Sequence, residues 1–483
     1  MFAGLDLGTS GVRALLVGAN GRPVGVADVA LDVQHLHPGW SEQAPDAWTQ
    51  AAAEALAQLK QAHPKAMAQL RGIGLSGQMH GATLLDEAGA VLRPCILWND
   101  TRSHEQAARL DATPGLREIS GNIVFPGFTA PKLNWLAEHE PETFARVATV
   151  LLPKDYLAYW LTGVIGSEMS DAAGTSWLDT GARAWSDDLL VKTGMRRDQM
   201  PELREGTGVV GPIRGDLAAE LGLPDTVQVV AGGADNAAAA CGVGALAEGD
   251  GFVSLGTSGV LLAARDGFAP SPETAVHTFC HAIPDTWYQM GVILAATDCL
   301  NWLARLTGLK PAELTAPLGD RITAPGTLRF LPYLSGERTP HNDSAVRGAF
   351  IGLDIGAGRD DLARAVLEGV SFALRDNLDA LVRTGANLDR VLAIGGGARS
   401  RYWVELLATI LELPVDLPAQ GEFGAALGAA RLAICGVTGA APADVMTRPA
   451  IAETIEPRRD LVPSYREAHG AFAASFPKLK AMP

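Results

Sequence analysis

A single carboxylate stands inside the first apolar run of the chain. The run reads GLDLGTSGVRALL from Gly4, with Asp6 between two leucines and a Gly-Thr-Ser-Gly turn just beyond it. Aspartate is disfavoured in strands, and an unpaired buried carboxylate is costly in free energy. Asp6 either bonds its own turn, or it holds Mg²⁺ through water beside a turn whose N–H and hydroxyl groups face phosphate.

The same turn occurs a second time. Residues 7–12 and 255–260 both read LGTSGV, an offset of 255 − 7 = 248 residues. Chance produces such a match at about the few-per-cent level in a chain of this length, so the repeat indicates two similar domains. The second copy has Ser254 where the first has Asp6. It is either a turn that holds phosphate with backbone amides alone, or a structural turn inherited by duplication.

A second carboxylate follows two glycines at a strand–helix junction. The motif Gly-Gly-Ala-Asp-Asn (232–236) ends the strand VQVVA and opens the helix NAAAAC. Asp235 is typical of a helix N-cap. The glycines also let a ligand approach the backbone, and a carboxylate there can act as general base on a substrate hydroxyl. Capping and catalysis are compatible.

A later glycine run lies at another strand–helix junction. Gly-Gly-Gly-Ala-Arg-Ser (395–400) follows VLAI and precedes an amphipathic helix. Such a junction suits the phosphate or adenosine of a nucleotide at the helix N-terminus. The run is not GxGxxG and lacks the lysine of a P-loop, so neither of those nucleotide sites is predicted.

The composition is that of a globular protein without a nucleic-acid surface. The 483 residues are 47% hydrophobic and 19% charged, with a formal net charge of −15 and no stripe of basic residues. Single cores stop growing at roughly 250–300 residues, so two cores are expected. The five cysteines form no CxxC motif, which indicates reduced thiols in a cytosolic enzyme. No run of about 18 large apolar residues predicts a membrane span.

Strands alternate with helices, which predicts an α/β protein in two parts. Residues 1–31 read as a meander of two or three strands, and residues 47–63 read as a helix. Strand, glycine turn and helix follow one another in 226–246 and again in 390–415. We place the boundary in the polar break near residues 245–252 and expect the ligand site between the two parts.

Together these motifs resemble the FGGY family of carbohydrate kinases. The segments GFTAPKLNWLAEH (127–139) and GAFIGLDIGAGRDDLARAVLEGV (348–370) also resemble its two longer patterns, and the resemblance covers essentially the whole chain. It implies an α/β protein of two similar domains with the actin/hexokinase/Hsp70-like ATPase (ribonuclease H-like) fold and a cleft between them. The domain 1–246 would hold the sugar and the catalytic base, and the domain 247–483 would hold the nucleotide.

Within the family, the chain is most similar to members that phosphorylate D-xylulose. Met79-His80 stands where glycerol-phosphorylating members, by the same resemblance, carry an Arg-Glu pair. The implied reaction transfers phosphate from ATP to the C5 hydroxyl of the ketopentose, with Mg²⁺. The other similar segments are WSEQ (40–43), SGQMHGATLLD (76–86), ILWNDTR (96–102), LLPKDYL (151–157), MSDAAGTSWLD (169–179) and LPYLSGERTPHN (331–342).

The resemblance assigns roles residue by residue. Asp235 matches the catalytic base that takes the proton of the C5 hydroxyl, and Asp6 matches the carboxylate tied to Mg²⁺ and activity. Met79 and His80 match the sugar-contacting pair, and Asn236 lies next to the base. Closing of the two domains would exclude water. The positions that match nucleotide contacts are Thr9, Ser10, Gly256, Thr257, Gly396 and Gly397.

Two polar segments are less specific. Trp98 and Asp100 are expected to line the sugar pocket; alternatively, Asn99 and Asp100 cap the following helix. Glu337 and Arg338 are expected to face the cleft or hinge, without a specific role.

Two alternative functions remain open at this point. One is a sibling kinase for another sugar, such as L-ribulose. The other is an actin/Hsp70-like nucleotide switch that binds a protein partner. Asp235 and the Met79-His80 loop count against this alternative.

His277 and His281 are spaced i,i+4 but have no third ligand group, so no metal site is predicted there. The resemblance makes a homodimer plausible, and no nucleic-acid or membrane partner is expected.

Overall fold

The first apolar run forms a meander at one end of a six-stranded sheet. The computed structural model describes residues 1–419 and 424–481. The meander strands pair antiparallel, as predicted; of the three strands on the other side of the first strand, two add in parallel and the edge strand pairs antiparallel. In spatial order the strands are β13 (Val209–Pro212), β14 (Gln228–Ala234), β5 (Gly72–Gly77), β1 (Phe2–Gly8), β2 (Gly11–Val17) and β3 (Pro23–Ala30).

A second sheet of seven strands repeats this plan. Its first strand pairs antiparallel with the next and parallel with a later one, and in each sheet the LGTSG turn joins the first two strands. The prediction of two similar α/β domains is therefore confirmed. In spatial order the strands are β17 (His277–Cys280), β18 (Trp287–Ile293), β16 (Gly259–Arg265), β15 (Gly251–Leu255), β21 (Val391–Ile394), β22 (Val415–Pro418) and β23 (Ile451–Ile455).

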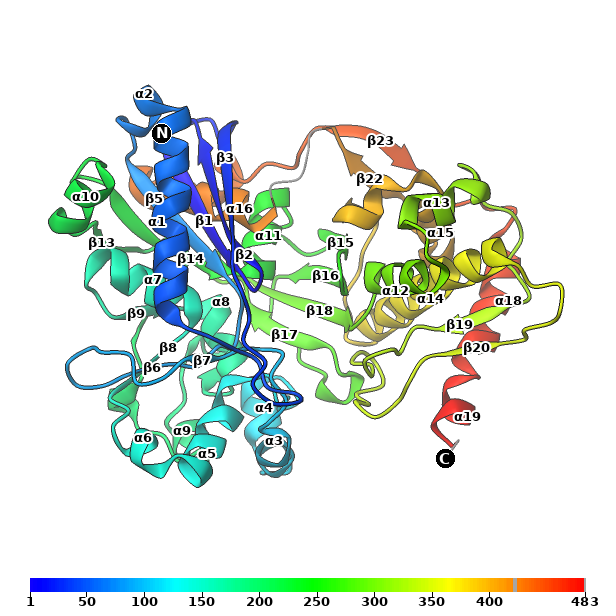
Figure 1. Ribbon diagram of the computed structural model, residues 1–483, viewed down its shortest axis with the longest axis horizontal. Coiled ribbons are helices and arrows are strands. Elements are labelled where there is room, and N and C mark those ends of the chain that lie inside the picture. Colours follow the sequence, from blue (N-terminus) through cyan, green and yellow to red (C-terminus); the bar gives the residue numbers. More distant parts are fainter. Residues whose placement is uncertain (420–423, 482–483) are drawn as a thin grey trace.

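Helix α16 (Gly424–Thr438) packs on the first sheet although it comes late in the sequence. Figure 1 shows it in orange beside the blue strands β1 and β2. Glycines in the strands permit this close packing, because a Cβ at Gly4 would lie 1.9 Å from Ala426 O and a Cβ at Gly74 would lie 1.9 Å from Ala429 O. The helix backbone therefore rests directly on the sheet.

The other face of the first sheet is covered by α1 (Pro45–Ala62), which buries Trp48 and Leu56, as its apolar spacing predicted. Helix α11 (Asp235–Val243) packs against α16. The chain passes to the second sheet directly after α11. Helix α16 comes from the second half of the sequence but packs on the first sheet. The predicted domain boundary at 246/247 therefore separates the two halves of the sequence but not the two packed units, and it stays a prediction.

The two halves of the chain also share buried contacts. Asn122 Nδ2 donates to Thr278 O at 2.8 Å, and Thr278 N donates to Asn122 Oδ1 at 3.0 Å. The rings of Phe128 and Phe279 lie 6.2 Å apart in the same core. Strand β17 of the second sheet thus forms part of a wall shared with the first half.

The remaining long helices lie mainly around the second sheet. Within residues 1–419 and 424–481, none is both long and apolar enough to cross a membrane. These helices are α5 (Thr129–His139) and α7 (Pro153–Thr162) in the first half, and α12 (Thr297–Thr307), α14 (Arg359–Arg383), α15 (Arg401–Leu411) and α18 (Val462–Ala473) in the second.

Replacing Gly428 tests the contact between α11 and α16. A Cβ there would lie 1.7 Å from Ala238 O of α11, so Gly428→Ala forces the helices apart. We expect it to lower the free energy of unfolding by roughly 1–3 kcal/mol or more, measured by urea denaturation. The control is Gly470→Ala in α18, where no heavy atom lies within 4 Å. Equal stability of the two variants would contradict the packing role.

Candidate active site

Asp6 and Asp235 lie at the same edge of the first sheet. Strands β1, β5 and β14 are parallel, so their carboxyl ends meet at one edge, which is where α/β sheets bind ligands. Asp6 is in register with Ser76 of β5, and Ser76 is in register with Gly233, two residues before Asp235. The structure therefore brings together the two carboxylates that the sequence singled out.

Asp235 is the first residue of α11. The N-cap position is occupied by Ala234, so the prediction that Asp235 is the N-cap is wrong by one residue. Its Oδ1 accepts hydrogen bonds from Asn236 N at 2.6 Å and from Asn236 Nδ2 at 2.9 Å. Burial raises the pKa of Asp235 to about 7, and the charge of Asp6 adds to the shift, while the bonds from Asn236 oppose it. Such a carboxylate can take up a proton near neutral pH.

The donor set at Asp6 fits a divalent cation. Burial raises the pKa of Asp6 above its ordinary value. In the described ranges, neither Asp6 nor Asp235 forms a close ion pair; Arg13 offsets part of the charge of Asp6 from a distance, and the charge of Asp6 in turn raises the pKa of Asp235. A hard divalent cation prefers carboxylate oxygens and would relieve this repulsion.

The first turn is held by side chains from the same half of the chain. Thr9 Oγ1 donates to Gln78 Oε1 at 3.0 Å and accepts from Trp98 Nε1 at 2.9 Å. Gln43 Nε2 donates to Thr9 O at 2.7 Å. These bonds fix the turn beside Asp6, and the Ser10 side chain is exposed at its tip.

The second turn is anchored to the start of α12. Thr297 donates to Gly256 O through its N–H at 3.0 Å and its hydroxyl at 2.8 Å. Thr257 O accepts from Ala296 N at 2.8 Å, and Thr257 itself is exposed. The two copies of the turn are therefore held by different partners.

A cavity of about 710 Å³ adjoins the second turn. It is lined by Gly396 and Gly397, which follow β21, and by Thr297 and Leu300 of α12. A Cβ at Gly396 would meet no heavy atom within 4 Å, whereas one at Gly397 would lie 2.7 Å from Leu255 Cβ. The late glycine run thus lines the cavity and lies beside Leu255, the residue that leads into the second turn, whereas Gly256 and Thr257 do not line it.

His80 lies on the loop that follows β5. Its ring stacks on Phe128 with centroids 4.5 Å apart, and its Nδ1 lies 2.7 Å from Gly174 O. Because a carbonyl oxygen only accepts, Nδ1 carries the proton and Nε2 keeps a free lone pair. Lys132 Nζ donates to His80 O at 2.8 Å. Burial lowers the pKa of His80 to about 3, so the ring is neutral.

Met79 connects this loop to the second sheet. Its Sδ lies 4.0 Å from the hydroxyl of Tyr288 on β18, and both side chains are buried. Tyr288, Phe128 and Gly174 were not predicted as part of the site. Each comes from a distant segment, and no sequence spacing relates any of them to Met79 or His80.

Trp98 and Asp100 have separate environments. Trp98 bonds the hydroxyl of Thr9, whereas Asp100 is buried and accepts from Ser41 N at 2.6 Å and from Arg102 Nη2 at 2.7 Å. Both oxygens of Asp100 are engaged by Ser41 and Arg102, which orders this loop, and its assignment as a sugar contact stays a prediction. The capping alternative for Asn99 and Asp100 is also wrong, because α3 (His104–Asp111) has Ser103 as its N-cap.

Arg338 lies against the aromatic wall. Its Nη1 is 3.5 Å from His277 Nε2, and its guanidinium lies 5.0 Å from the ring of Phe125. Glu337 Oε1 accepts from Leu294 N at 3.1 Å, and burial raises the pKa of Glu337 to about 8. These contacts place Glu337 and Arg338 beside the wall that β17 shares with the first half of the chain.

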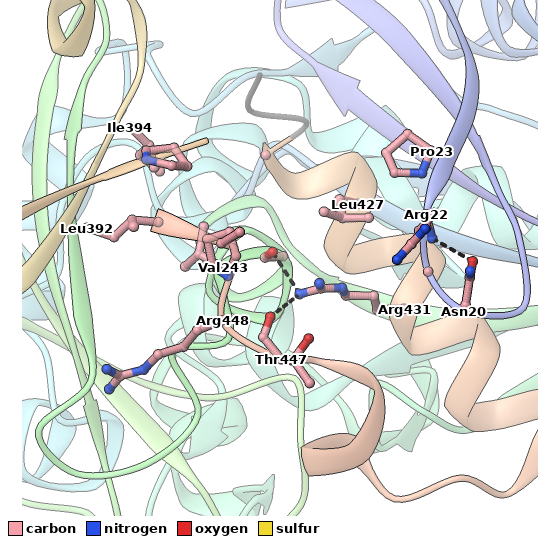
Figure 2. Close-up of a pocket in the computed structure, with 16 residues that line it drawn as sticks. Asn20, Arg22, Pro23, Val243, Leu392, Ile394, Leu427, Arg431, Thr447 and Arg448 are labelled. Carbon is pink, nitrogen blue, oxygen red and sulfur yellow. Dashed lines mark hydrogen bonds between the residues drawn. The ribbon is translucent and has the colours of Figure 1, made fainter. Parts of the chain in front are cut away.

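A cavity of about 880 Å³ lies away from these residues. Figure 2 shows Arg431 pointing into it between Arg22 and Thr447. Arg431 Nη1 donates to the carbonyls of Cys241, Gly242 and Thr447, so it caps the carboxyl end of α11. None of the predicted site residues lines this cavity.

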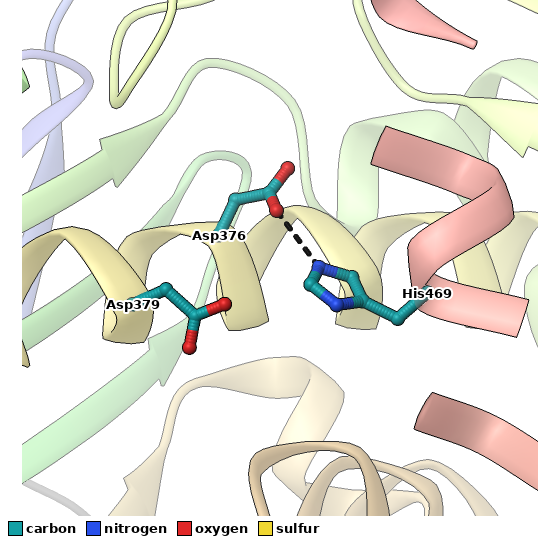
Figure 3. Close-up of side chains that lie close together, drawn as sticks. All are labelled: Asp376, Asp379 and His469. Carbon is teal, nitrogen blue, oxygen red and sulfur yellow. Dashed lines mark hydrogen bonds and ion pairs between the residues drawn. The ribbon is translucent and has the colours of Figure 1, made fainter. Parts of the chain in front are cut away.

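One group of three potential metal ligands occurs among the described residues. Figure 3 shows this group, which consists of Asp376 and Asp379 of α14 and His469 of α18. The group is far from Asp6 in the sequence. Asp379 is already paired with Arg375 at 2.8 Å. The group does not include His277 or His281.

Comparison with known proteins matches both parts of the chain to one family. The model of the FGGY family of carbohydrate kinases, N-terminal domain, matches residues 1–242, and that of the C-terminal domain matches residues 251–437. The chain is 49% identical over 437 residues to the xylulose kinase of Escherichia coli (strain K12), covering 90% of this chain and 89% of that protein. It is 46% identical over 484 residues to the xylulose kinase of Klebsiella pneumoniae, covering 99% of each.

Solved structures agree with this match. A xyloylose kinase from Brucella ovis superposes with a TM-score of 0.97 at 56% sequence identity and covers 100% of both chains. A xylulose kinase from Rhodospirillum rubrum superposes with a TM-score of 0.91 at 30% identity and covers 99% of both chains. Sequence and fold therefore give the same relatives over the whole length.

The environment of His80 predicts that its imidazole does not titrate near neutral pH. An ordinary histidine has a pKa of about 6.5, whereas burial lowers that of His80 to about 3. We expect its ring resonances, assigned by comparison with His80→Asn, to show no step between pH 5 and 8 in an NMR titration. A step in that range would contradict the buried neutral tautomer.

Proposed function

This chain belongs to the FGGY family of carbohydrate kinases, and we propose that Asp235 is the general base of its phosphoryl transfer. The protein is an ATP-dependent sugar kinase, and its activity is the phosphorylation of xylulose, supported by relatives 41–49% identical over most of the chain. The observation that carries the proposal for the base is the partly buried carboxylate of Asp235 at the start of α11, at the sheet edge that it shares with Asp6, where desolvation raises its pKa to about 7.

The proposed step transfers one proton and one phosphoryl group. Asp235 takes the proton of the C5 hydroxyl of D-xylulose while O5 forms a bond to the γ-phosphorus of ATP. The bond from that phosphorus to the β,γ-bridging oxygen breaks, which gives D-xylulose 5-phosphate and ADP. Asn236 bonds Oδ1 of the base and leaves Oδ2 for the hydroxyl, since no described residue donates to Oδ2. Phosphoryl transfer depends mainly on such positioning.

Asp6 is the proposed holder of Mg²⁺, through water. The ion, when bound, would neutralise charge on the phosphates. Asp6 itself lies beside the first turn and raises the pKa of Asp235 through its charge. Its fit rests on a partly buried carboxylate without an ion pair in the described ranges.

Met79 and His80 are the proposed sugar contacts. His80 Nδ1 is fixed on Gly174 O, so Nε2 can accept a hydrogen bond from a sugar hydroxyl. The pKa of His80 is lowered to about 3, so this acceptor is available throughout the working pH range. The buried thioether of Met79 closes the pocket against Tyr288.

The nucleotide is proposed to lie between the two turns. Gly396 and Gly397 would receive it in the cavity beside α12, and the turns with Thr9, Ser10, Gly256 and Thr257 would face its phosphates.

We also propose that the protein is a homodimer and that it works in the cytosol. Within the described ranges all five cysteines are unpaired and buried, which favours a reducing compartment.

Asp235→Asn tests the base directly. The amide keeps the shape of the side chain and cannot take the proton, so kcat should fall by roughly 10²–10⁴-fold while ATP still binds. The measurement is ADP release coupled to D-xylulose, with ATP affinity from calorimetry. The matched control is Asp216→Asn on the exposed side of α10 (Gly215–Leu221), which should change neither. Sugar-dependent turnover near the wild-type rate in Asp235→Asn would falsify the assignment.

The pH dependence follows from the raised pKa of Asp235. The base works only when ionised, so kcat/KM should fall about tenfold per pH unit below pH 7 and level off above it. His80 should add no step, since its pKa lies near 3. The measurement is a profile of kcat/KM for D-xylulose from pH 5 to 9. A profile flat down to pH 5 would place the pKa of the base well below this value.

A further inference from the structure

We propose that Ser170 and Glu168 are positioning residues for the catalytic base, with the buried ammonium of Lys154 as their counter-charge. The inference rests on the proposed role of Asp235. It goes beyond that role because these residues act through the backbone of Ala234 rather than on substrate.

Strand β14 is irregular just before Asp235. Its parallel register with β5 shifts between Val230 and Gly233. Gly232 adopts φ +81°, and its N–H donates to Gly206 O at 2.9 Å, outside the β5 pairing. An irregularity of this kind re-aims a side chain but disrupts the ladder locally. Pairing with β5 resumes only at Gly233 and Ala234, so the end of β14 is held by this short ladder and by an anchor from outside the sheet.

Ser170 supplies this anchor. Its Oγ accepts the N–H of Ala234 at 3.0 Å and donates to Glu168 Oε1 at 2.8 Å. Gly233 lies beside this hydroxyl: a Cβ there would be in contact with Ser170 Oγ at 3.4 Å and would come within 2.8 Å of Ala282 Cβ. Ala234 directly precedes Asp235, so the hydroxyl fixes the backbone from which the base projects.

Glu168 orients Ser170. Its carboxylate accepts the N–H groups of Ser170 at 2.7 Å and of Asp171 at 2.8 Å, which caps the short helix α8 (Met169–Ala172). Glu168, Ser170 and Asp171 are all completely buried. A carboxylate in such a place requires a compensating cation and hydrogen bonds.

Lys154 is that cation. Its Nζ lies 3.4 Å from Glu168 Oε1, 3.6 Å from Asp171 Oδ2 and 2.6 Å from Asp155 Oδ1, and its side chain is 1% exposed. Burial by itself lowers the pKa of Lys154, but the three carboxylates raise it overall, so the ammonium stays charged. The chain of contacts runs from Lys154 through Glu168 and Ser170 to Ala234. It ends at the residue before the base.

Ser170→Ala removes the one side-chain hydrogen bond that the described residues make to Ala234. A misplacement of about 1 Å in a reacting group can cost about 10²-fold in rate, so we expect kcat for D-xylulose to fall 10- to 100-fold. KM for ATP should stay within about threefold of wild type, because the cavity at Gly396 is untouched. The measurement is steady-state kinetics in both substrates, on protein shown to be folded by its thermal transition.

Ser186→Ala is the matched control. Ser186 caps helix α9 (Asp187–Lys192) through its hydroxyl, which accepts Leu189 N at 3.3 Å, so it too is a serine that bonds a backbone N–H, but it makes no hydrogen bond to β14. It should match Ser170→Ala in loss of stability and leave kcat unchanged. Equal kcat in the two variants, or a loss in Ser170→Ala that lies in KM for ATP, would overturn the proposal.

Glu168→Gln is the second variant, and it decides the outcome if Ser170→Ala does not fold. It keeps the size of the side chain and removes the charge that faces Lys154, and the same kcat-specific loss is expected. Wild-type kcat in Glu168→Gln overturns the positioning role. Asp235→Asn separates this failure from failure of the proposed base. If Asp235→Asn is inactive and Glu168→Gln is fully active, only the positioning role is refuted. If Asp235→Asn is active, the assignment of Asp235 as the base is refuted.

Discussion

The parallel pairing of β1, β5 and β14 is the constraint on which the site depends. Parallel strands end at one edge, so Asp6 and Asp235 meet there although most of the first half of the chain separates them. Burial at that edge raises the pKa of both carboxyls. The arrangement that brings the groups together thus also gives Asp235 a pKa suited to proton uptake near neutral pH.

Close packing of helix on sheet holds this edge in place. Helix α16 rests on β1 and β5 at Gly4 and Gly74, where a side chain would collide with the helix backbone. Because α16 comes from the second half of the chain, this face of the first sheet is covered only when that late helix packs on it. The base itself lies on α11, which packs against α16. Folding of the second half and placement of the base are therefore coupled.

The duplication gives the two halves the same turn but not the same chemistry. The first turn follows a strand with Asp6 and is tied to Gln78 and Trp98, whereas the second follows a strand with Ser254 and is tied to Thr297. Identical sequences at the two turns thus have different neighbours. The asymmetry arises because different segments of the chain pack against each turn.

The sequence by itself determined the local features of the protein. Alternating patterns fixed the strands and helices, and motifs with special residues marked Asp235 and the Met79-His80 loop before any coordinates. It misplaced the N-cap of α11 by one residue, because the backbone conformation of Ala234 decides the cap. It also could not show that Asp100 pairs with Arg102, or that Tyr288 of the second sheet contacts Met79. Such pairings were decided only by tertiary structure, because they join segments whose separation in sequence carries no signal of contact.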